Sequence, residues 1–379
     1  MPTPKVPPGR PTCCFIDLEA LRWNFRQIKE KVGPQVKVLS MVKANAYGHG
    51  AAAVAHALAD EGSDAFGVAT LEEGIELRQA GIRQPIIVLA GAYVEQSNQF
   101  LERDLTPVIH ELETLRKLEA AVQRQSATLA IHLEVDTGMG RTGFLAAEVD
   151  LWLPELTKLK ALSIEGVFSH FSDAETANEA YSENQLRDFL AVIKRLRSAG
   201  IAPPLVHMAK SAAVLTVPDS HLAMVRPGLA LYGIYPSPQL SRDIVLKPVL
   251  SWKTRILQLK RVPEEASVGY GRTFVTRRES LIGTLPVGYA DGYPRILSNR
   301  AVVLVRGCRV PVAGRVSMDL TTIDVTDIDG VQQGDEVVLL GRQGDVTISA
   351  DEMASWANTI SYEILTSIGA RVPRIHHHS

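Results

Sequence analysis

The sequence predicts an α/β protein with an N-terminal (β/α)8 barrel, similar to a TIM barrel, and a C-terminal, mainly β domain. Eight short apolar segments alternate with segments long enough to be helices up to about residue 235, which is typical of a closed barrel. Beyond about residue 242, segments rich in β-branched residues follow one another across short turns. The length of 379 residues also exceeds what one hydrophobic core usually supports, which favours two domains.

The barrel domain is expected to begin with a helix and a buried strand. Asp17 is a suitable N-cap, apolar residues recur at helical spacing over Leu18–Val32, and Gly33 supplies a stop. The run Val36–Val42 is almost continuously apolar, as expected for a strand buried on both faces. A doubly wound open sheet is the alternative to a closed barrel. Further strands are expected at Asp64–Thr70, Pro85–Ala90, Thr106–His110, Leu129–Asp136, Ile164–His170, Leu205–Ala209 and Met224–Leu229.

The second domain is predicted from strand-like segments and one helix. That helix begins with Ser349 and Glu352 in the spacing of a capping box. We assign residues 14–242 to the barrel domain and 243–379 to the C-terminal domain, which residues 1–13 are expected to join, with Tyr235–Lys247 as the junction. The strands are expected at Leu250–Leu259, Leu281–Pro286, Ala301–Val305, Thr321–Val325 and Glu336–Leu340.

The composition argues against several classes of function. The net charge is -2 and no basic block occurs, so no nucleic-acid partner is expected. The sequence has neither an apolar run of membrane-spanning length nor a signal peptide, which predicts a cytoplasmic protein with no membrane partner. Three cysteines, with Cys13 and Cys14 adjacent, are too few for a disulfide framework. No metal site is expected, and His376–His378 is interpreted as a tail without function.

The most informative segment is residues 42–50, with the sequence VKANAYGHG. Lys43 directly follows the first buried strand, so its amine is expected at the C-terminal mouth of the barrel, where barrels place their chemistry. Partial burial there lowers the pKa of an amine and makes it a better nucleophile toward an aldehyde. Gly48 and Gly50 allow the backbone to turn into the alanine-rich helix that follows. Together these features predict a reactive lysine at position 43.

Residues 42–50 resemble the cofactor-lysine motif of the bacterial alanine racemases, which belong to the fold-type III pyridoxal-phosphate enzymes. One matching segment would be weak evidence, but several in the family's order are specific. The resemblance implies a pyridoxal-phosphate enzyme that interconverts L-alanine and D-alanine and supplies D-alanine for cell-wall peptidoglycan. The other matching segments cover both domains: Asp136–Gly143 (DTGMGRTG), Arg226–Gly233 (RPGLALYG), Gly269–Thr273 (GYGRT), Gly288–Tyr293 (GYADGY), Gly314–Asp319 (GRVSMD) and Ser361–Glu363 (SYE).

The resemblance also implies a two-base mechanism, with one base on each face of the substrate. Lys43 would carry pyridoxal phosphate and act as one base. Tyr270, contributed by the partner subunit of a homodimer with shared active sites, would act as the other. A free phenol, with a pKa of about 10, is a poor base at neutral pH, so cations or hydrogen bonds must favour its phenolate. His170, at the end of the sixth predicted strand, matches the family histidine that contacts this network.

The remaining site residues are carried over from the same matches. Arg226 would face the pyridine nitrogen, where an arginine cannot give up a proton, so the ring is a weaker electron sink. His207 would support Arg226. The phosphate would be held by Tyr47, Ser211, Gly228, Leu229 and Tyr362. The substrate, alanine, would meet a narrow pocket made by Arg141, Met318, Tyr289 and Asp319.

Three positions depart from the family pattern. Glu134 stands where many members carry a carbamylated lysine, and we expect its carboxylate to hold Arg141 in place of the carbamate. Lys210 stands at a usual asparagine, where its charge either strengthens phosphate binding or points away. Ser317 replaces a common cysteine, which is not expected to alter the mechanism.

Several other functions stay open. Residues 138–143 fit G-x-G-x-x-G, with Glu165 at a suitable separation for a ribose contact, so a nicotinamide-dependent oxidoreductase is the rival enzyme. A non-catalytic pyridoxal-phosphate-binding barrel is a third reading, although relatives of that kind lack the β domain. A broad-specificity amino-acid racemase and a related barrel decarboxylase also remain. The decarboxylase is disfavoured because Ser317 and Cys308 do not obviously provide its reactive cysteine.

Overall fold

The structure, a computed structural model, describes residues 9–175, 179–237, 240 and 243–378. The described residues form two compact units. The C-terminal unit contains residues 9–20, 47–50 and 248–378, and the barrel unit contains residues 21–46 and those of 51–247 that are described. The expected boundary at residue 242 lies outside the described residues. The two units differ from the expected ranges at residues 14–20 and 47–50, which belong to the C-terminal unit, and at residues 243–247, which belong to the barrel unit.

The barrel unit is a closed ring of parallel strands, as predicted. The strand order β5-β4-β3-β2-β10-β9-β8-β6 closes through the pairing of β5 with β6, which excludes the open doubly wound sheet. Strands β3, β4 and β5 are buried along their whole length, as parallel strands covered on both faces must be. The eight barrel strands in the described part of the chain are β2 (Lys37–Met41), β3 (Ala65–Val68), β4 (Ile86–Val88), β5 (Thr106–Ile109), β6 (Leu129–Asp136), β8 (Leu162–Phe168), β9 (Leu205–Lys210) and β10 (Met224–Arg226). The short β7 (Phe144–Leu145) pairs with the end of β6.

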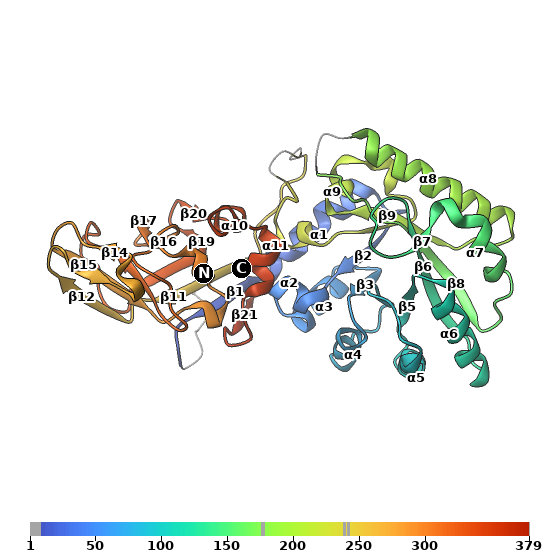
Figure 1. Cartoon of the computed structure of the whole chain (residues 1–379), viewed down its shortest axis with the longest axis horizontal. Coiled ribbons are helices and arrows are strands. Elements are labelled where there is room, and N and C mark those ends of the chain that lie inside the picture. Colours follow the sequence, from blue (N-terminus) through green and yellow to red (C-terminus); the bar gives the residue numbers. More distant parts are fainter. Residues whose placement is uncertain (1–8, 176–178, 238–239, 241–242, 379) are drawn as a thin grey trace. The chain divides into compact units, whose positions relative to one another are not determined.

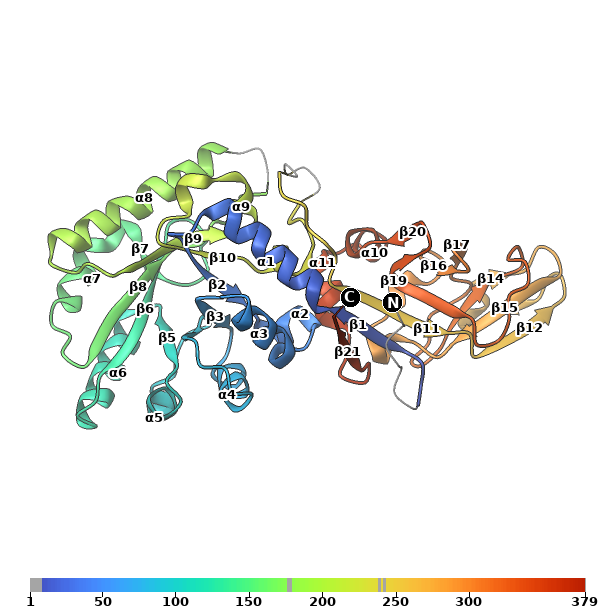
Figure 2. The same ribbon diagram turned by 180° about the vertical axis from the view of Figure 1, so that it is seen from behind.

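Helices cover the outside of the barrel (Figures 1 and 2). The predicted N-cap of the first helix is confirmed, because Oδ1 of Asp17 accepts hydrogen bonds from Glu19 N at 2.9 Å and Ala20 N at 3.0 Å. The helices are α1 (Leu18–Val32), α2 (Lys43–Gly48), α3 (Ala51–Asp60), α4 (Leu71–Gln79), α5 (Ser97–Glu102), α6 (Leu112–Arg124), α7 (Val149–Leu156), α8 (Glu179–Ser198) and α9 (Ser211–Thr216).

The C-terminal unit is mainly β, as predicted. Its largest sheet has the order β17-β16-β19-β11-β1-β21, with β20 beside β19, and smaller sheets are formed by β12-β15-β18 and β13-β14. The expected strand Leu250–Leu259 is two strands, β11 and β12, which lie in different sheets. The strands are β1 (Cys13–Asp17), β11 (Leu250–Arg255), β12 (Gln258–Val262), β13 (Ser267–Val268), β14 (Phe274–Val275), β15 (Ser280–Leu285), β16 (Val302–Val305), β17 (Cys308–Pro311), β18 (Thr321–Asp324), β19 (Glu336–Gln343), β20 (Val346–Ile348) and β21 (Arg374–His377).

The C-terminal unit also contains the helices α10 (Ala350–Ala357) and α11 (Ser361–Ser367). The capping box predicted for α10 is present in part, because Ser349 Oγ accepts a hydrogen bond from Glu352 N at 3.0 Å. Helix α11 was not predicted. The interpretation of the final histidines as a tail is wrong. Strand β21 pairs in parallel with β1, with Ile375 opposite Phe15, and His376 Nε2 lies 2.8 Å from the carbonyl oxygen of His49.

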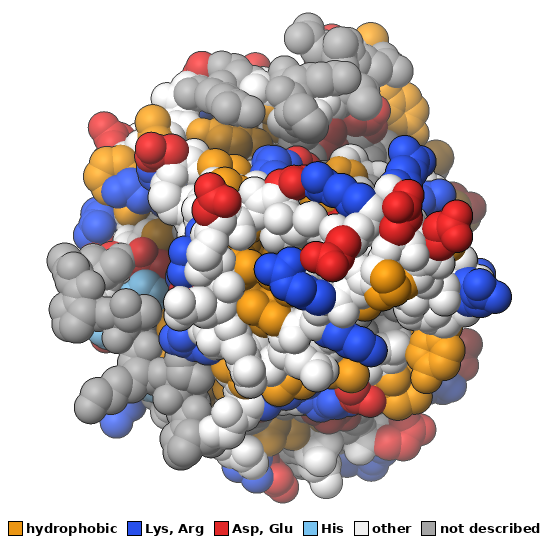
Figure 3. Space-filling view, turned by 90° about the vertical axis from the view of Figure 1, so that its left-hand side faces the viewer, with side chains coloured by type: hydrophobic (Ala, Val, Ile, Leu, Met, Phe, Trp, Pro, Cys, Tyr) orange, Lys and Arg blue, Asp and Glu red, His pale blue; other side chains and the backbone are white. Residues whose placement is uncertain are grey.

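The face of the C-terminal unit that carries β12, β14 and β15 mixes basic, acidic and scattered hydrophobic side chains (Figure 3). No broad field of one charge is visible on this face. Among the helices in the described ranges, none is both long and apolar enough to cross a membrane.

Candidate active site

Lys43 stands where the first barrel strand ends and an uncommon backbone turn begins. Residues 44–47 all have positive φ, between 52° and 54°, and Gly48 follows at 82°. Four successive non-glycine residues in this region form a left-handed helical turn, which costs about 1–2 kcal/mol per residue. Such strain persists only where the surrounding structure enforces it, and it concentrates at functional sites. The sequence predicted a turn from Gly48 and Gly50, but not its handedness.

Two side chains of the barrel hold the left-handed turn. Glu73 accepts a hydrogen bond from Ala44 N at 2.6 Å and another from Ala69 N at 2.7 Å, while forming a capping box with Thr70 at the start of α4. Asn45 Oδ1 accepts a hydrogen bond from Ala51 N at 2.8 Å, where α3 begins. Glu73 was not predicted as a site residue, although the T-x-x-E pattern of residues 70–73 was a usable signal.

The amine of Lys43 lies among cations at the mouth of the barrel. Loss of hydration is the main cause that lowers the pKa of Lys43, and the positive charges of Arg141 and Arg226 lower it further. Glu73 acts in the opposite direction. A larger fraction of this amine is therefore unprotonated at neutral pH than for an ordinary lysine, which is what a nucleophile or a base requires.

Arg226, at the end of β10, is buried in a shell of hydrogen-bond acceptors. Its NH1 lies 2.8 Å from His207 Nδ1, and its NH2 lies 2.8 Å from Ser169 O and 3.1 Å from His170 Nδ1. The guanidinium carbon is 4.7 Å from the centre of the Phe168 ring. Burial lowers the pKa of Arg226 to about 10, with Glu134 opposing this and Arg141 adding to it, so the group stays charged at neutral pH.

The charge of Arg226 determines where the neighbouring histidines carry their protons. A guanidinium can only donate, so Nδ1 of His207 and Nδ1 of His170 must be acceptors. Burial, and next the charge of Arg226, hold the pKa of both histidines well below the ordinary value, so both rings are neutral. Each neutral ring therefore carries its proton on Nε2. His207 Nε2 then donates to His132 Nδ1 at 3.0 Å.

His132 on β6 is the far end of this chain of rings, and sequence analysis missed it. Burial, and then Arg226, lower the pKa of His132 to about 3. Its ring occupies the space beside Gly166 on β8, where a Cβ would come within 2.2 Å of the imidazole. The pairing of His132 with Gly166 could have indicated this site. It depends on the register between β6 and β8, which the sequence does not show.

Ser211 lies beside the backbone turn that follows β10. Ser211 Oγ accepts hydrogen bonds from Gly228 N at 2.8 Å and Ala230 N at 3.3 Å, which leaves its own hydroxyl proton free to donate. Leu229 opens the short helix at this point. Beside Ser211, Lys210 Nζ pairs with Glu175 Oε2 at 2.8 Å, so its charge is engaged by a carboxylate.

The glycine-rich loop 138–143 folds around a carboxylate instead of presenting its amides to a ligand. Oδ1 of Asp136 accepts hydrogen bonds from Gly138 N at 2.8 Å and Met139 N at 2.9 Å, and Oδ2 accepts from Gly140 N at 3.0 Å. The amides that a dinucleotide phosphate would need are therefore already used. This arrangement removes the structural basis of the nicotinamide hypothesis and leaves Arg141 exposed at the tip of the loop.

Glu134 is buried below the same loop. Its carboxylate accepts a hydrogen bond from Thr142 Oγ1 at 2.8 Å and lies 2.8 Å from His110 Nδ1. Among the ion pairs of the described residues, none joins Glu134 to Arg141. The expected direct contact is thus replaced by a contact with Thr142, the next residue along the loop.

The other predicted site residues lie in the C-terminal unit. Tyr270 is 72% exposed on the turn before β14, and Met318 and Tyr289 are 53% and 43% exposed. Tyr289 N donates to Ser317 O at 3.0 Å, so the last two lie on adjoining loops. Asp319 Oδ1 accepts from Arg371 NH2 at 2.8 Å. The Tyr47 and Tyr362 rings are 6.0 Å apart in the same unit.

Comparison with known proteins gives a family match for each part of the chain. Residues 16–236 match the family model "Alanine racemase, N-terminal domain", and residues 249–376 match "Alanine racemase, C-terminal domain". "Alanine racemase 2" of Caldanaerobacter subterraneus subsp. tengcongensis is 44% identical over 97% of this chain and 95% of its own length.

Solved structures give the same result. Alanine racemase from Bacillus anthracis "with bound L-Ala-P" matches with a TM-score of 0.93 and 37% identity, over 99% of this chain and 97% of that chain. Alanine racemase from Bartonella henselae "with covalently bound pyridoxal phosphate" matches with a TM-score of 0.88 and 32% identity, over 98% of this chain and 100% of that chain. The chain therefore belongs to the alanine racemase family.

Proposed function

We propose that this chain racemises alanine with pyridoxal phosphate held on Lys43, by a two-base mechanism in which Tyr270 of the partner subunit is the second base. The enzyme would act in the cytoplasm, and its product, D-alanine, would be used to build cell-wall peptidoglycan. The observation that carries the proposal is the position of Lys43 just after the first barrel strand, at a left-handed turn, in a chain that matches the alanine racemase family over both domains. The direction of its pKa shift supports the proposal.

The residues of the barrel mouth fit pyridoxal phosphate. The amine of Lys43 suits an aldehyde, the hydroxyl of Ser211 has a proton to donate, and the amide of Leu229 lies next to it. Gly228 N donates to Ser211 Oγ in this structure and would have to give up that bond to reach the phosphate. This position, after the last barrel strands, is where barrels commonly bind phosphate. Tyr47 and Tyr362 would add their hydroxyls. When bound, pyridoxal phosphate supplies an aldehyde for the amino group of alanine and a ring that withdraws electrons from Cα.

Lys43 would exchange a proton with Cα on one face of alanine. Because its pKa is lowered by lost hydration and by Arg141 and Arg226, it takes up and releases a proton more readily at neutral pH. On the opposite face, Tyr270 needs hydrogen bonds that favour its phenolate. His170 is suited to this, because its Nδ1 is committed to Arg226 and its Nε2 therefore carries a proton to donate.

Arg226 would limit the reaction to racemisation. Held by His207, His170 and Ser169 O, its guanidinium would face the pyridine nitrogen and stay charged. It cannot hand over a proton, so less of the charge that develops at Cα spreads into the ring. Side reactions such as transamination, which need stronger delocalisation, are then slower.

The shared site rests on exposed residues of the C-terminal unit. Tyr270, Tyr289 and Met318 are large apolar or aromatic side chains open to solvent in the chain. A group of this kind on neighbouring loops is typical of a surface that another subunit covers. In a homodimer, Met318, Tyr289 and Asp319 would narrow the substrate pocket around the methyl group of alanine, while Arg141 would meet the substrate carboxylate.

The test is racemisation of L-alanine by the purified protein, with Lys43→Ala as the control and larger L-amino acids alongside. We expect D-alanine to form, and both activity and the visible absorbance of the bound cofactor to be lost in the variant. A larger amino acid racemised while alanine is inert would favour a broad-specificity racemase. A protein that binds the cofactor and racemises nothing would refute the proposal, and release of carbon dioxide should then be measured.

A further inference from the structure

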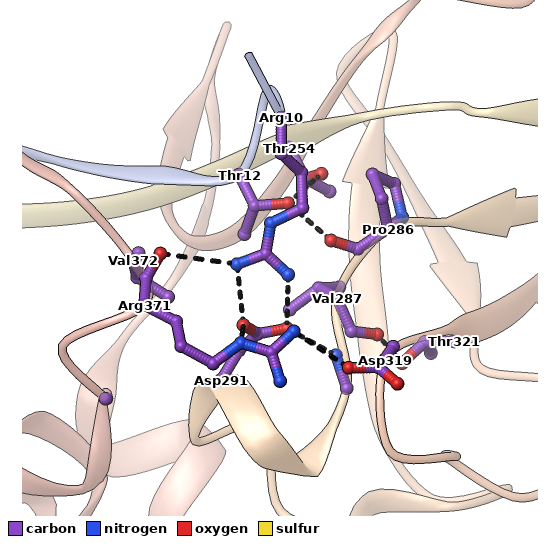
Figure 4. A network of polar contacts seen from close by, with 12 residues as sticks. Arg10, Thr12, Thr254, Pro286, Val287, Asp291, Asp319, Thr321, Arg371 and Val372 are labelled. Atoms are coloured by element: carbon purple, nitrogen blue, oxygen red, sulfur yellow. Dashed lines mark hydrogen bonds and ion pairs between the residues drawn. The ribbon is translucent and has the colours of Figure 1, made fainter. Parts of the chain in front are cut away.

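Asp291 is a fully buried carboxylate in the C-terminal unit, held by two arginines from opposite ends of the chain (Figure 4). Arg10 binds it with both terminal nitrogens, NH1 to Oδ2 at 2.9 Å and NH2 to Oδ1 at 2.6 Å. Arg371 Nε lies 3.4 Å from Oδ1. Gly288 N donates to Oδ2 at 3.0 Å. A buried charge with this many partners is costly to disturb, because removing one partner leaves the others uncompensated.

Arg371 connects this carboxylate to a second one. Its NH2 donates to Asp319 Oδ1 at 2.8 Å while its Nε faces Asp291 (Figure 4). Asp319 directly follows Met318, and Asp291 follows Tyr289 by two residues. One arginine therefore joins the two loops that carry the exposed side chains Tyr289 and Met318.

Two buried threonines hold the beginning of the loop that contains Tyr289. Thr12, two residues after Arg10, donates to Pro286 O at 2.6 Å. Thr321, two residues after Asp319, donates to Val287 O at 2.8 Å. The beginning of the loop that contains Tyr289 is thus held by the segments that carry Thr12 and Thr321. Further along the loop, Asp291 is held by Arg10 and by Arg371, which also binds Asp319.

The backbones of the two loops also lie against each other. Tyr289 N donates to Ser317 O and Ala290 N to Met318 O, each at 3.0 Å. A Cβ on Gly288 would come within 2.3 Å of the Ser317 and Met318 carbonyl oxygens, so only glycine allows this approach. The backbone segments that carry Tyr289 and Met318 are therefore hydrogen-bonded to each other, and the first of them also carries Asp291.

We infer that Asp291, with Arg10 and Arg371, is a positioning residue that sets where Tyr289 and Met318 stand when they form the substrate pocket. The inference rests on the proposed function for the role of those two side chains. Asp291 itself acts only through its neighbours, because its carboxylate is wholly buried. The N-terminal segment that carries Arg10 thereby contributes to the geometry of substrate binding.

The test compares Asp291→Asn and Arg371→Met with Arg278→Met in the purified full-length protein. Arg278 forms a similar two-contact pair with Asp327, at 2.6 Å and 2.7 Å, in the same unit and away from these loops. We expect KM for alanine to rise about tenfold, equivalent to about 1.4 kcal/mol, in the first two variants, with a smaller fall in kcat. The control should keep both constants, and Arg371→Lys should recover most of the loss.

Hydrogen exchange provides a readout that does not depend on activity. The amides of residues 288–293 should exchange faster in Asp291→Asn than in the parent protein. In Arg278→Met their exchange rates should stay unchanged. Unchanged KM together with unchanged exchange in a folded Asp291→Asn protein would overturn the inference. If Asp291→Asn does not fold, Arg371→Met decides, since Arg371 is half-exposed. A parent protein that fails to racemise alanine refutes the proposed function, whereas the exchange comparison still tests the positioning role.

Discussion

His207 donates a hydrogen bond from Nε2 to His132 Nδ1 at 3.0 Å, while its Nδ1 accepts one from Arg226 at 2.8 Å. Arg226 thus forces His207 into the tautomer protonated on Nε2. His132 accepts the hydrogen bond from this buried N–H, which would otherwise have no partner. The three side chains come from β10, β9 and β6.

His132→Leu should destabilise the protein more than His132→Asn. Leucine leaves the buried N–H of His207 without a partner, at a cost of about 1–3 kcal/mol, whereas asparagine can offer an oxygen near the position of Nδ1. Urea unfolding of the two variants measures the difference. Gly166→Ala should resemble His132→Leu, because its Cβ would displace the imidazole ring. Equal stability of the leucine and asparagine variants would contradict the role of His132.

Ala44→Gly should be neutral or stabilise the protein by up to about 1 kcal/mol, because glycine relieves a φ of 52°. Ala120→Gly, at an exposed position within α6, should instead lose about 1 kcal/mol, as glycine does in a right-handed helix. Thermal or denaturant unfolding compares the pair. A similar loss in both variants would show that residues 44–47 carry no left-handed strain.

The amine of Lys43 should react with acetic anhydride at lower pH than that of Lys117. Lost hydration, Arg141 and Arg226 lower the pKa of Lys43, whereas Glu113 raises the pKa of Lys117. Only the unprotonated amine reacts, so the labelling rate of each lysine rises with pH and reaches half its maximum at the pKa of that lysine. Mass spectrometry of the cofactor-free protein measures both lysines in one sample. Arg141→Met should move the Lys43 profile to higher pH, and identical profiles for the two lysines would count against the prediction.

Glu134→Gln should weaken the hold on the loop that carries Arg141. The carboxylate accepts from Thr142 and lies beside His110, and it also raises the pKa of the buried Arg226. We expect lower cofactor affinity and a several-fold higher KM for alanine, with Thr142→Val showing the KM effect alone. Fluorescence titration of the cofactor and initial-rate kinetics separate the two. An enzyme unchanged in both respects would end the idea that Glu134 substitutes for a carbamate.

Specific activity should fall on dilution, because each proposed site takes Tyr270 from the partner subunit. Activity assays over a range of enzyme concentrations, matched to the oligomeric state by analytical ultracentrifugation, measure this dependence. Constant activity in a proven monomer would rule out the shared site.

The barrel was predictable because its strands are buried on both faces and therefore read as apolar runs, as in β3 and β5. Strand β1 and strand β21 were not, since each is a short segment whose partner lies at the other end of the chain. Lys43 and Arg226 were identified through their surrounding motifs. Glu73, His132 and Asp291 were not singled out, because each acts on a residue from a different element.

The pairing of β5 with β6 that closes the barrel came from the tertiary structure, whereas the sequence by itself predicted the buried barrel strands, the position of Lys43 at the end of one of them and the membership of its motifs in one family. The predicted properties are local, since they depend on periodicity and on neighbouring residues. Only the tertiary structure decided that Asp136 accepts hydrogen bonds from the amides of the glycine-rich loop. It also decided that Lys210 pairs with Glu175. Finally, it placed Glu134 in contact with Thr142 instead of Arg141. A charged group takes whichever partner the fold brings within hydrogen-bond distance, and strand register determines that distance.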